Sequence, residues 1–291
     1  MNIAILSRGE QLYSTQSLLK AGLVRDHNME VLDPSYCTMA IEDGKSVLYY
    51  YNELVDDLDA VIPRIGASNT YFGSSLVRHF QSMGVFCVVE AEPILQSRNK
   101  WTCFQILSEA NIPIPKTILG NGPDIEAMLS KFGTPPVIIK ILQGTHGQGV
   151  ILAETYTSAF STIETLQTSK VRFIIQEFIE ESNGADLRVI VIDGVVVAAM
   201  KRQSKEGEFR SNLHRGGSSN VINLSHQEEN LALQTAKALR LGVCGVDILQ
   251  SANGPLILEA NSTPGLEGIE TTTGVNISEK IIRYIERNKR K

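Results

Sequence analysis

Residues 243–261 read VCGVDILQSANGPLILEAN, two apolar runs joined by a short polar segment. This pattern predicts a β-hairpin. Asp247 stands in the first run, while Glu259 and Asn261 stand in the second, two residues apart and therefore on one face of a strand. An odd turn, such as residues 252–254, brings Asp247 opposite Glu259, whereas an even turn places it on the other face.

With the odd register, two carboxylates and an amide oxygen converge on one face of the hairpin. Two like charges 4 Å apart repel by roughly 4 kcal/mol at an effective dielectric of 20, so the pair needs a proton or a cation. Oxygen ligands of this kind suit Mg²⁺ or Mn²⁺, and two such metals would clamp a nucleotide's phosphates from both sides. The alternative is a solvated polar strand face that binds nothing.

A glycine-rich loop, GTHGQG at residues 144–149, separates two further strand-like runs at 136–140 and 149–153. Glycines let consecutive backbone N–H groups approach phosphate oxygens closely. A strand follows the loop instead of the helix that a dinucleotide-binding fold requires, so the loop is typical of a lid over nucleotide phosphates. Lys140 ends the first run, where burying a lysine is costly unless an anion meets it. The alternative is an ordinary hairpin turn.

Residues 201–217 form a polar stretch that contains five lysines and arginines against two glutamates. Such a stretch supplies hydrogen-bond donors to an anionic substrate or transition state. Two alternatives stay open, a solvated charged loop and a nucleic-acid patch. The second is disfavoured because the stretch has one aromatic residue and no stacking series.

The first third of the chain alternates short apolar runs with helical stretches, which predicts a parallel sheet with helices on its faces. The expected strands are at 3–6, 30–32, 60–62 and 85–89, and the expected helices are at 12–24 and 72–83. Ser97 is the expected N-cap of the next helix, and Pro113 and Pro115 form a connector after it. Later elements are a strand at 173–179, a hairpin around Asp193-Gly194, and a helix at 227–241.

Composition narrows the class of protein. The chain has 291 residues with 43% hydrophobic content and a net charge of -5, which fits a soluble globular protein without general attraction to nucleic acid or anionic lipid. We expect no signal peptide and no membrane helix. Four scattered cysteines without a CxxC motif predict buried thiols in a reducing cytoplasm. The five histidines share no zinc-ligand spacing, and no GxSxG motif is present.

The order of these motifs resembles the ATP-grasp superfamily. Within it, RSNLHRGG at 210–217 and NSTPGLEGIE at 261–270 closely resemble the RimK-type glutamate ligases, which add glutamates to the C-terminus of a small-subunit ribosomal protein. IAILSR at 3–8 and VIPRIG at 61–66 are similar to the N-terminal lobe of that family. The resemblance implies an α/β fold with α+β lobes: a parallel pre-ATP-grasp domain at 1–95, a central lobe with a glycine-rich lid at 96–180, and a C-terminal metal-binding lobe at 181–291.

The resemblance also implies roles for individual residues. Asp247, Glu259 and Asn261 would bind two Mg²⁺ or Mn²⁺ ions, and Arg210 would stabilise the acyl-phosphate and the tetrahedral oxyanion. Phe178 stands where tyrosine is familiar in the family, and Ser262-Thr263 where Ala-Ser is expected, yet neither change removes a ligand. The residues expected to bind ATP are Lys100, Lys140, Glu177, Phe178, Asp186, Arg210, Ser211 and Asn212.

By this resemblance the protein is a cytoplasmic ligase that joins L-glutamate to the C-terminus of a ribosomal protein, or forms poly-α-glutamate, through an acyl-phosphate. It would use ATP and two divalent metals, contact no nucleic acid or membrane directly, and form a homo-oligomer such as a tetramer. The alternatives are an ATP-grasp ligase for a small cofactor, an amino-carrier protein or a free amino acid, a kinase that stops at phosphorylation, and an RNA-binding protein. No base for the amine is identified.

Overall fold

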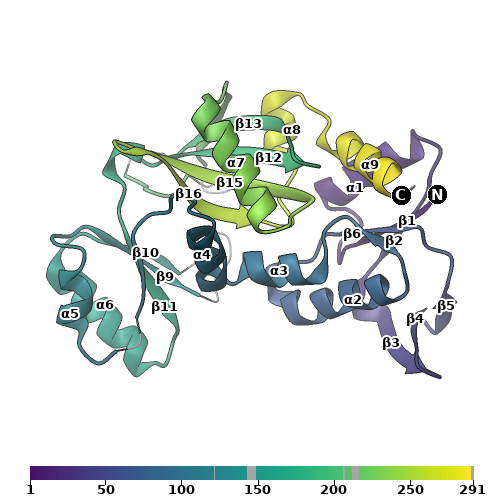
Figure 1. Cartoon of the computed structure of the whole chain (residues 1–291), viewed down its shortest axis with the longest axis horizontal. Helices are drawn as coiled ribbons and strands as arrows, with labels where there is room; N and C mark the ends of the chain where they lie inside the picture. The colour runs from purple at the N-terminus through teal and green to yellow at the C-terminus, as the bar shows by residue number, and fades with distance from the viewer. Residues whose placement is uncertain (121, 143–148, 206, 212–215, 290–291) are drawn as a thin grey trace.

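The computed structural model describes residues 1–120, 122–142, 149–205, 207–211 and 216–289. Figure 1 shows an N-terminal α/β domain at one end, a small lobe at the other, and a C-terminal sheet between them. Most of the predicted lid, residues 144–148, lies outside the described residues, and so does Asn212. Within the described ranges, no helix is both long enough and apolar enough to cross a membrane.

The N-terminal domain contains the predicted parallel sheet, in the order β2-β1-β6-β7. Parallel strands are covered on both faces, so they read as continuous apolar runs, and Ile3 to Leu6 are indeed fully buried. Its strands are β1 (Asn2–Leu6), β2 (Asn28–Leu32), β6 (Ala60–Pro63) and β7 (Phe86–Cys87), with helices α1 (Tyr13–Leu23) and α2 (Thr70–Ser82).

A second, antiparallel sheet in this domain was not predicted. It consists of β3 (Cys37–Glu42), β4 (Lys45–Tyr50) and β5 (Glu53–Val55). Its two turns, at Asp43-Gly44 and Tyr51-Asn52, place both central residues at positive φ, the conformation of tight hairpins. The sheet escaped prediction because its strands mix polar and apolar residues without a strict alternation.

The predicted N-cap at Ser97 is wrong. Ser97 lies inside helix α3 (Ala91–Arg98), where its hydroxyl donates to the Ile94 carbonyl at 3.2 Å. The chain leaves the helical conformation at Asn99, whose side chain accepts a hydrogen bond from the Thr102 N–H at 3.2 Å and caps helix α4 (Lys100–Glu109). Lys100 is therefore the first residue of α4.

The central lobe has the sheet order β10-β9-β11-β8 and a hydrophobic core of its own. Strands β9 and β10 pair antiparallel, which confirms the hairpin predicted around the glycine-rich segment. The elements of the lobe are β8 (Thr117–Gly120), α5 (Ile125–Ser130), β9 (Val137–Ile141), β10 (Val150–Ala153), α6 (Tyr156–Thr168) and β11 (Phe173–Glu177).

The C-terminal lobe is an antiparallel sheet in the order β14-β13-β12-β15-β16. Asp193 and Gly194 have positive φ and form the predicted turn between β12 and β13. One continuous core joins this sheet to the N-terminal domain, so the division at residues 95 and 180 stays a proposal. The elements are β12 (Ala185–Ile192), β13 (Val195–Gln203), β14 (Ser218–Val221), α7 (His226–Ala238), β15 (Val243–Ser251), β16 (Gly254–Asn261), α8 (Glu267–Thr273) and α9 (Ile277–Asn288).

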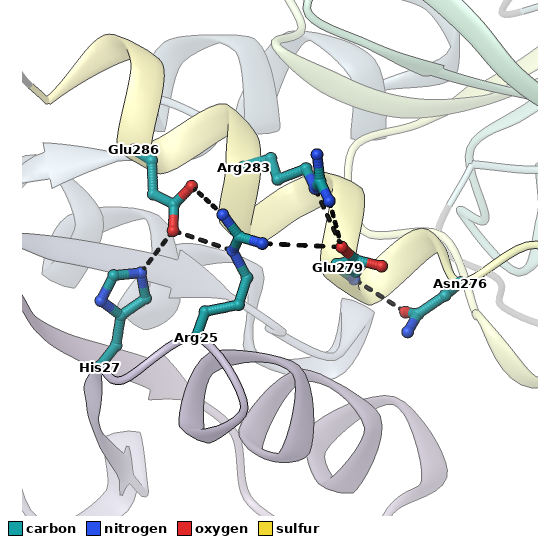
Figure 2. Close-up of polar contacts among 6 residues, drawn as sticks. All are labelled: Arg25, His27, Asn276, Glu279, Arg283 and Glu286. Carbon is teal, nitrogen blue, oxygen red and sulfur yellow. Dashed lines mark hydrogen bonds and ion pairs between the residues drawn. The ribbon is translucent and has the colours of Figure 1, made fainter.

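Helix α9 returns to the N-terminal domain and is held against the end of α1 by ion pairs. Figure 2 shows Glu286 between Arg25, which donates two hydrogen bonds at 2.9 and 2.7 Å, and His27 at 2.8 Å. Arg25 also lies 3.7 Å from Glu279. A bidentate pair with a second donor fixes the orientation of both elements.

Candidate active site

A β-bulge brings the predicted metal ligands to one face. The turn between β15 and β16 is even, because Ser251 pairs with Gly254, and a regular hairpin would therefore place Leu258 opposite Asp247. Instead the register shifts by one residue, so that Leu258 is extra and Asp247 pairs with Glu259. Side chains directly opposite on antiparallel strands share a face. The turn is thus the even alternative, and the bulge still produces the juxtaposition that was expected only from an odd turn.

Polar side chains continue across the same face of the sheet. Arg188 on β12 lies opposite Asp247, and Arg202 on β13 lies opposite Asp186. Asp186 and Arg188 are two residues apart and point to the same side. The row across the four strands therefore consists of Arg202, Asp186 with Arg188, Asp247 and Glu259.

Asp247 is the centre of this row and is almost fully buried. Arg188 donates to it from Nε at 2.7 Å and from an Nη at 2.6 Å, and Arg202 donates at 2.9 Å. Burial opposes ionisation of the carboxyl, but the two guanidinium groups outweigh it and lower the pKa of Asp247 to about 2. Asp247 is therefore a carboxylate throughout the physiological pH range.

Asp186, predicted to help bind the nucleotide, is already paired in the structure. Its two oxygens accept hydrogen bonds from Arg202 at 2.7 and 2.5 Å, and both side chains are buried. Arg202 thus bridges Asp186 and Asp247. Asp186 is thus linked to Asp247 by the hydrogen bonds of Arg202.

Lys140, from another element, lies in electrostatic range of both Glu259 and Lys100. Burial lowers the pKa of Lys140 to about 8, which Glu259 opposes and Lys100 reinforces. Lys140 donates a hydrogen bond to the Gln176 amide oxygen at 2.5 Å, and the Gln176 amide is in turn fixed by Thr117 at 2.9 Å. The charges of the two lysines thus act on each other, and among the described residues the hydrogen-bond partner of Lys140 is a neutral amide.

The donor set fits a hard divalent cation. A carboxylate offers about four lone-pair positions, and Asp247 uses three for the arginines, which leaves one on Oδ1. In the part of the chain that the structure describes, the side chains of Glu259 and Asn261 accept no hydrogen bond, so their oxygens are available. No group of three His, Cys, Asp or Glu stands together among the described residues. The remaining ligands would therefore come from water and phosphate.

The charge balance of the site favours a polyanion together with a cation. The row contains three acids and two arginines, and Lys100 and Lys140 add two positive charges near Glu259. A bare metal ion meets repulsion from four cationic side chains. A metal carried by a nucleotide's phosphate groups meets charges of both signs in suitable places.

The predicted adenine site lies at the end of β11. Glu177 accepts a hydrogen bond from the Lys116 N–H at 2.9 Å and donates its own N–H to the Lys116 carbonyl. Phe178 follows the strand and is half-buried. Among the described residues, no backbone group takes its N–H or C=O, so these main-chain atoms are free to bind an adenine edge.

Arg210 lies beside the strand that follows the predicted lid. It donates to the Val150 carbonyl at 3.5 Å and forms a two-point ion pair with Glu208 at 2.8 and 2.9 Å. Ser211, the next residue, is buried. The structure thus brings the basic stretch to the edge of the lid hairpin, and the catalytic role of Arg210 stays a prediction.

Two contributors were missed from the sequence, Arg188 and Gln176. Both stand inside apolar strands, where a long polar side chain must find a partner. Arg188 follows Asp186 at the two-residue spacing of one strand face, and this spacing was a signal that could have identified it.

Comparison with known proteins finds two family models that together span almost the whole chain. Residues 1–94 match the RimK PreATP-grasp domain, and residues 97–285 match the RimK-like ATP-grasp domain. A probable alpha-L-glutamate ligase of Vibrio parahaemolyticus is 50% identical over 289 residues, which cover 99% of this chain and 96% of that protein. A protein of the same description from Halorhodospira halophila is 47% identical over 291 residues, which cover 100% of this chain and 96% of that protein.

Solved structures share the fold at low sequence identity. The ATP-grasp ligase PsnB, in complex with a phosphomimetic variant of its minimal precursor, Mg and ADP, superposes with a TM-score of 0.76 at 18% identity, covering 100% of this chain and 98% of that one. A D-alanine–D-alanine ligase from Bacillus anthracis gives a TM-score of 0.69 at 17% identity, and the match covers 99% of this chain and 97% of that chain. These likenesses establish the ATP-grasp fold.

Proposed function

Because this chain belongs to the RimK-like ATP-grasp family, and so to the ATP-dependent ligases that form carbon–nitrogen bonds, we propose that it adds L-glutamate to the C-terminus of a protein or peptide. The observation that carries this proposal is the charged row ending at Glu259, with Lys100 and Lys140 beside it. The glutamate preference is supported by full-length relatives described as probable alpha-L-glutamate ligases.

The chemistry divides into two displacements. In the first, a carboxylate oxygen of the acceptor attacks the γ-phosphorus of ATP, the bond to the bridging oxygen of ADP breaks, and an acyl-phosphate forms. In the second, the amine nitrogen of glutamate attacks the acyl carbon, the bond to phosphate breaks, and the nitrogen loses a proton as the amide forms. Both steps depend on positioning and on neutralising phosphate charge.

Different residues of the site would bind the phosphates, hold the metal and stabilise the acyl group. Lys100 and Lys140 would hold phosphate oxygens, and Arg188 and Arg202 keep Asp247 ionised and oriented. Asp247, Glu259 and Asn261 would hold Mg²⁺, which when bound supplies positive charge against the phosphates. Arg210, next to the lid strand, would meet the negative charge that develops at the acyl group. The proton acceptor for the amine is unassigned.

Product masses test the proposed activity. The purified chain, ATP, Mg²⁺ and L-glutamate are incubated with a peptide that ends in glutamate, and with the same peptide carrying a C-terminal amide. We expect successive mass gains of one glutamate residue on the free-acid peptide and none on the amide, because only a carboxylate can be phosphorylated. ADP release without mass gain on any acceptor would contradict the ligase proposal.

The acceptor is the finer part of the proposal. We propose the C-terminus of a small-subunit ribosomal protein, with cytoplasmic location and homo-oligomeric assembly as parts of the same proposal. Mass gain on free glutamate or on a small cofactor, with none on a protein C-terminus, would reassign the acceptor and leave the ATP chemistry intact.

Proton uptake tests the role of Lys140. Its pKa of about 8 means that much of it is neutral at pH 9, and a phosphate group beside it raises that pKa again. ATP binding at pH 9 is therefore expected to take up a fraction of a proton, whereas binding at pH 6.5 takes up none, because the lysine is already charged. Calorimetry in buffers of different ionisation enthalpy measures this uptake. Lys140→Met should abolish the pH 9 uptake, and unchanged uptake in that variant would exclude Lys140 as its source.

A further inference from the structure

Arginines gather at the carboxyl edge of the N-terminal parallel sheet. From β1 the chain passes to β2 on one side, and β6 lies on the other side of β1. This reversal makes the carboxyl ends of β1 and β6 a topological switch point, the place where open α/β sheets bind ligands. Arg8 stands two residues after β1, and Arg64 directly follows β6.

A third arginine, Arg98, supports the loop between them. It lies at the end of α3 and donates to the carbonyls of Ile65 and Gly66, the latter at 3.3 Å, and to the Thr70 hydroxyl at 2.9 Å. Arg8 donates to Ser68 in the same loop at 3.2 Å. Arg8 and Arg98 thus both donate hydrogen bonds to the segment that follows Arg64.

Arg64 differs from the other two. Within the described ranges its half-buried guanidinium group makes no hydrogen bond and no ion pair, although it carries five donors. Burial lowers the pKa of Arg64 to about 10, and the charge of Arg98 adds to this, while Glu270 opposes it. A half-buried arginine beside another arginine is costly unless an anion meets it.

The nearest acid does not supply that anion. Glu270, on α8, accepts hydrogen bonds from the Ser17 hydroxyl at 3.1 Å and from the Ser278 N–H at 2.9 Å. Its two oxygens are therefore directed to α1 and α9. The charge of Glu270 acts on Arg64, but its oxygens are engaged elsewhere, so among the described residues Arg64 keeps an unpaired positive charge.

The cluster is connected to the candidate active site by short stretches of chain. Arg98 donates to the Thr263 hydroxyl at 3.1 Å, and Thr263 stands two residues after Asn261. Arg98 itself stands two residues before Lys100. Arg98 therefore joins the loop that follows Arg64 to the segments that carry Lys100 and Asn261.

We propose that Arg64, with Arg8 beside it and Arg98 supporting the loop, binds the carboxylate groups of the amino acid that supplies the amine. This inference rests on the proposed ligase function. The amine must point at the acyl-phosphate, so the carboxylates of the same molecule point away from it, toward a cationic surface. Guanidinium groups match carboxylates at two points, and a dicarboxylic amino acid offers two carboxylates for two arginines.

Kinetics of Arg64→Gln test the proposal, with Arg78→Gln as the control. Arg78 is an exposed arginine of the same domain, and it pairs with Glu92 on the surface at 3.1 Å. A hydrogen bond to a charged group contributes roughly 1.5–3 kcal/mol. We therefore expect the KM for glutamate to rise about 10- to 100-fold in Arg64→Gln, with the Kd for ATP and the KM for the acceptor peptide within about twofold of wild type. The preference for glutamate over glutamine should also fall.

The outcomes separate the two proposals. If the wild type forms amide but Arg64→Gln leaves the KM for glutamate unchanged, this inference is overturned and the ligase function stands. A rise in the KM of the peptide alone assigns the arginines to the acceptor's carboxylates and overturns it as well. No amide from the wild type with any amino acid is a failure of the proposed function. Urea unfolding of Arg64→Gln shows whether the variant is folded.

Discussion

Glu259→Gln is expected to lower kcat for amide formation about 10³-fold, while the free energy of unfolding stays within about 0.5 kcal/mol of wild type. Glu259 is exposed and makes no side-chain hydrogen bond in the part of the chain that the structure describes, so the substitution removes no packing. It removes one negative charge from the ligand set and from the surroundings of Lys140. A loss of activity without loss of stability is typical of a functional residue.

Coupled ADP release, the mass of the peptide product and urea unfolding measure these effects. Glu229→Gln is the matched control, because Glu229 is an exposed glutamate on α7, the helix that packs against the same hairpin. The control should retain wild-type kcat. Full activity in Glu259→Gln would exclude Glu259 from the proposed metal site and leave Asp247 and Asn261 as an insufficient set of ligands.

Arg202→Met is expected to lower the free energy of unfolding by about 3–5 kcal/mol. Arg202 is buried and is the only described partner of the Asp186 carboxylate, and it is one of two partners of Asp247. Removing it leaves a buried carboxylate without compensation, and this is far costlier than losing a surface pair. Because methionine retains most of the volume of the arginine side chain, the measured loss of stability reflects the missing positive charge and not a cavity.

Urea unfolding monitored by tryptophan fluorescence and by circular dichroism measures this destabilisation. Arg287→Gln is the control, because Arg287 pairs with Asp193 at 3.0 Å with both side chains exposed, and such a pair contributes only about 0–1 kcal/mol. The double variant Arg202→Met, Asp186→Leu should recover part of the lost stability, since it removes the orphaned acid. Equal stabilities of Arg202→Met and Arg287→Gln would show that the buried network does not stabilise the fold.

The sequence indicated which polar residues meet on the last hairpin, but not the local geometry that brings them together. Asp247, Glu259 and Asn261 stood out as candidate ligands because polar side chains interrupt apolar strands there, and Glu259 and Asn261 have the two-residue spacing of one face. The bulge at Leu258 was not recognisable, because a bulged residue has no distinctive side chain. The spacing of Arg188 from Asp186 was a usable signal for a shared face, but the pairing of Arg188 with Asp247, 59 residues away, comes only from the sheet.

Fold prediction succeeded where periodicity was strong and failed where it was weak. The parallel sheet and the hairpin at Asp193-Gly194 followed from apolar runs and turn residues. The helical break at Asn99 was placed at Ser97, because both residue types favour N-caps and only backbone geometry distinguishes them. The arginine cluster escaped attention because Arg8, Arg64 and Arg98 are far apart in the sequence, after β1, after β6 and at the end of α3.

The bulge also separates two properties of the last hairpin that are normally linked. In a regular hairpin the number of residues at the tip dictates which side chains meet further along the strands. Here the additional residue Leu258 shifts the register by one between the tip and Asp247. The length of the tip therefore does not by itself determine which residue lies opposite Asp247. A change of one residue in the length of the tip could thus be absorbed by losing that register shift, and the carboxylates would still meet.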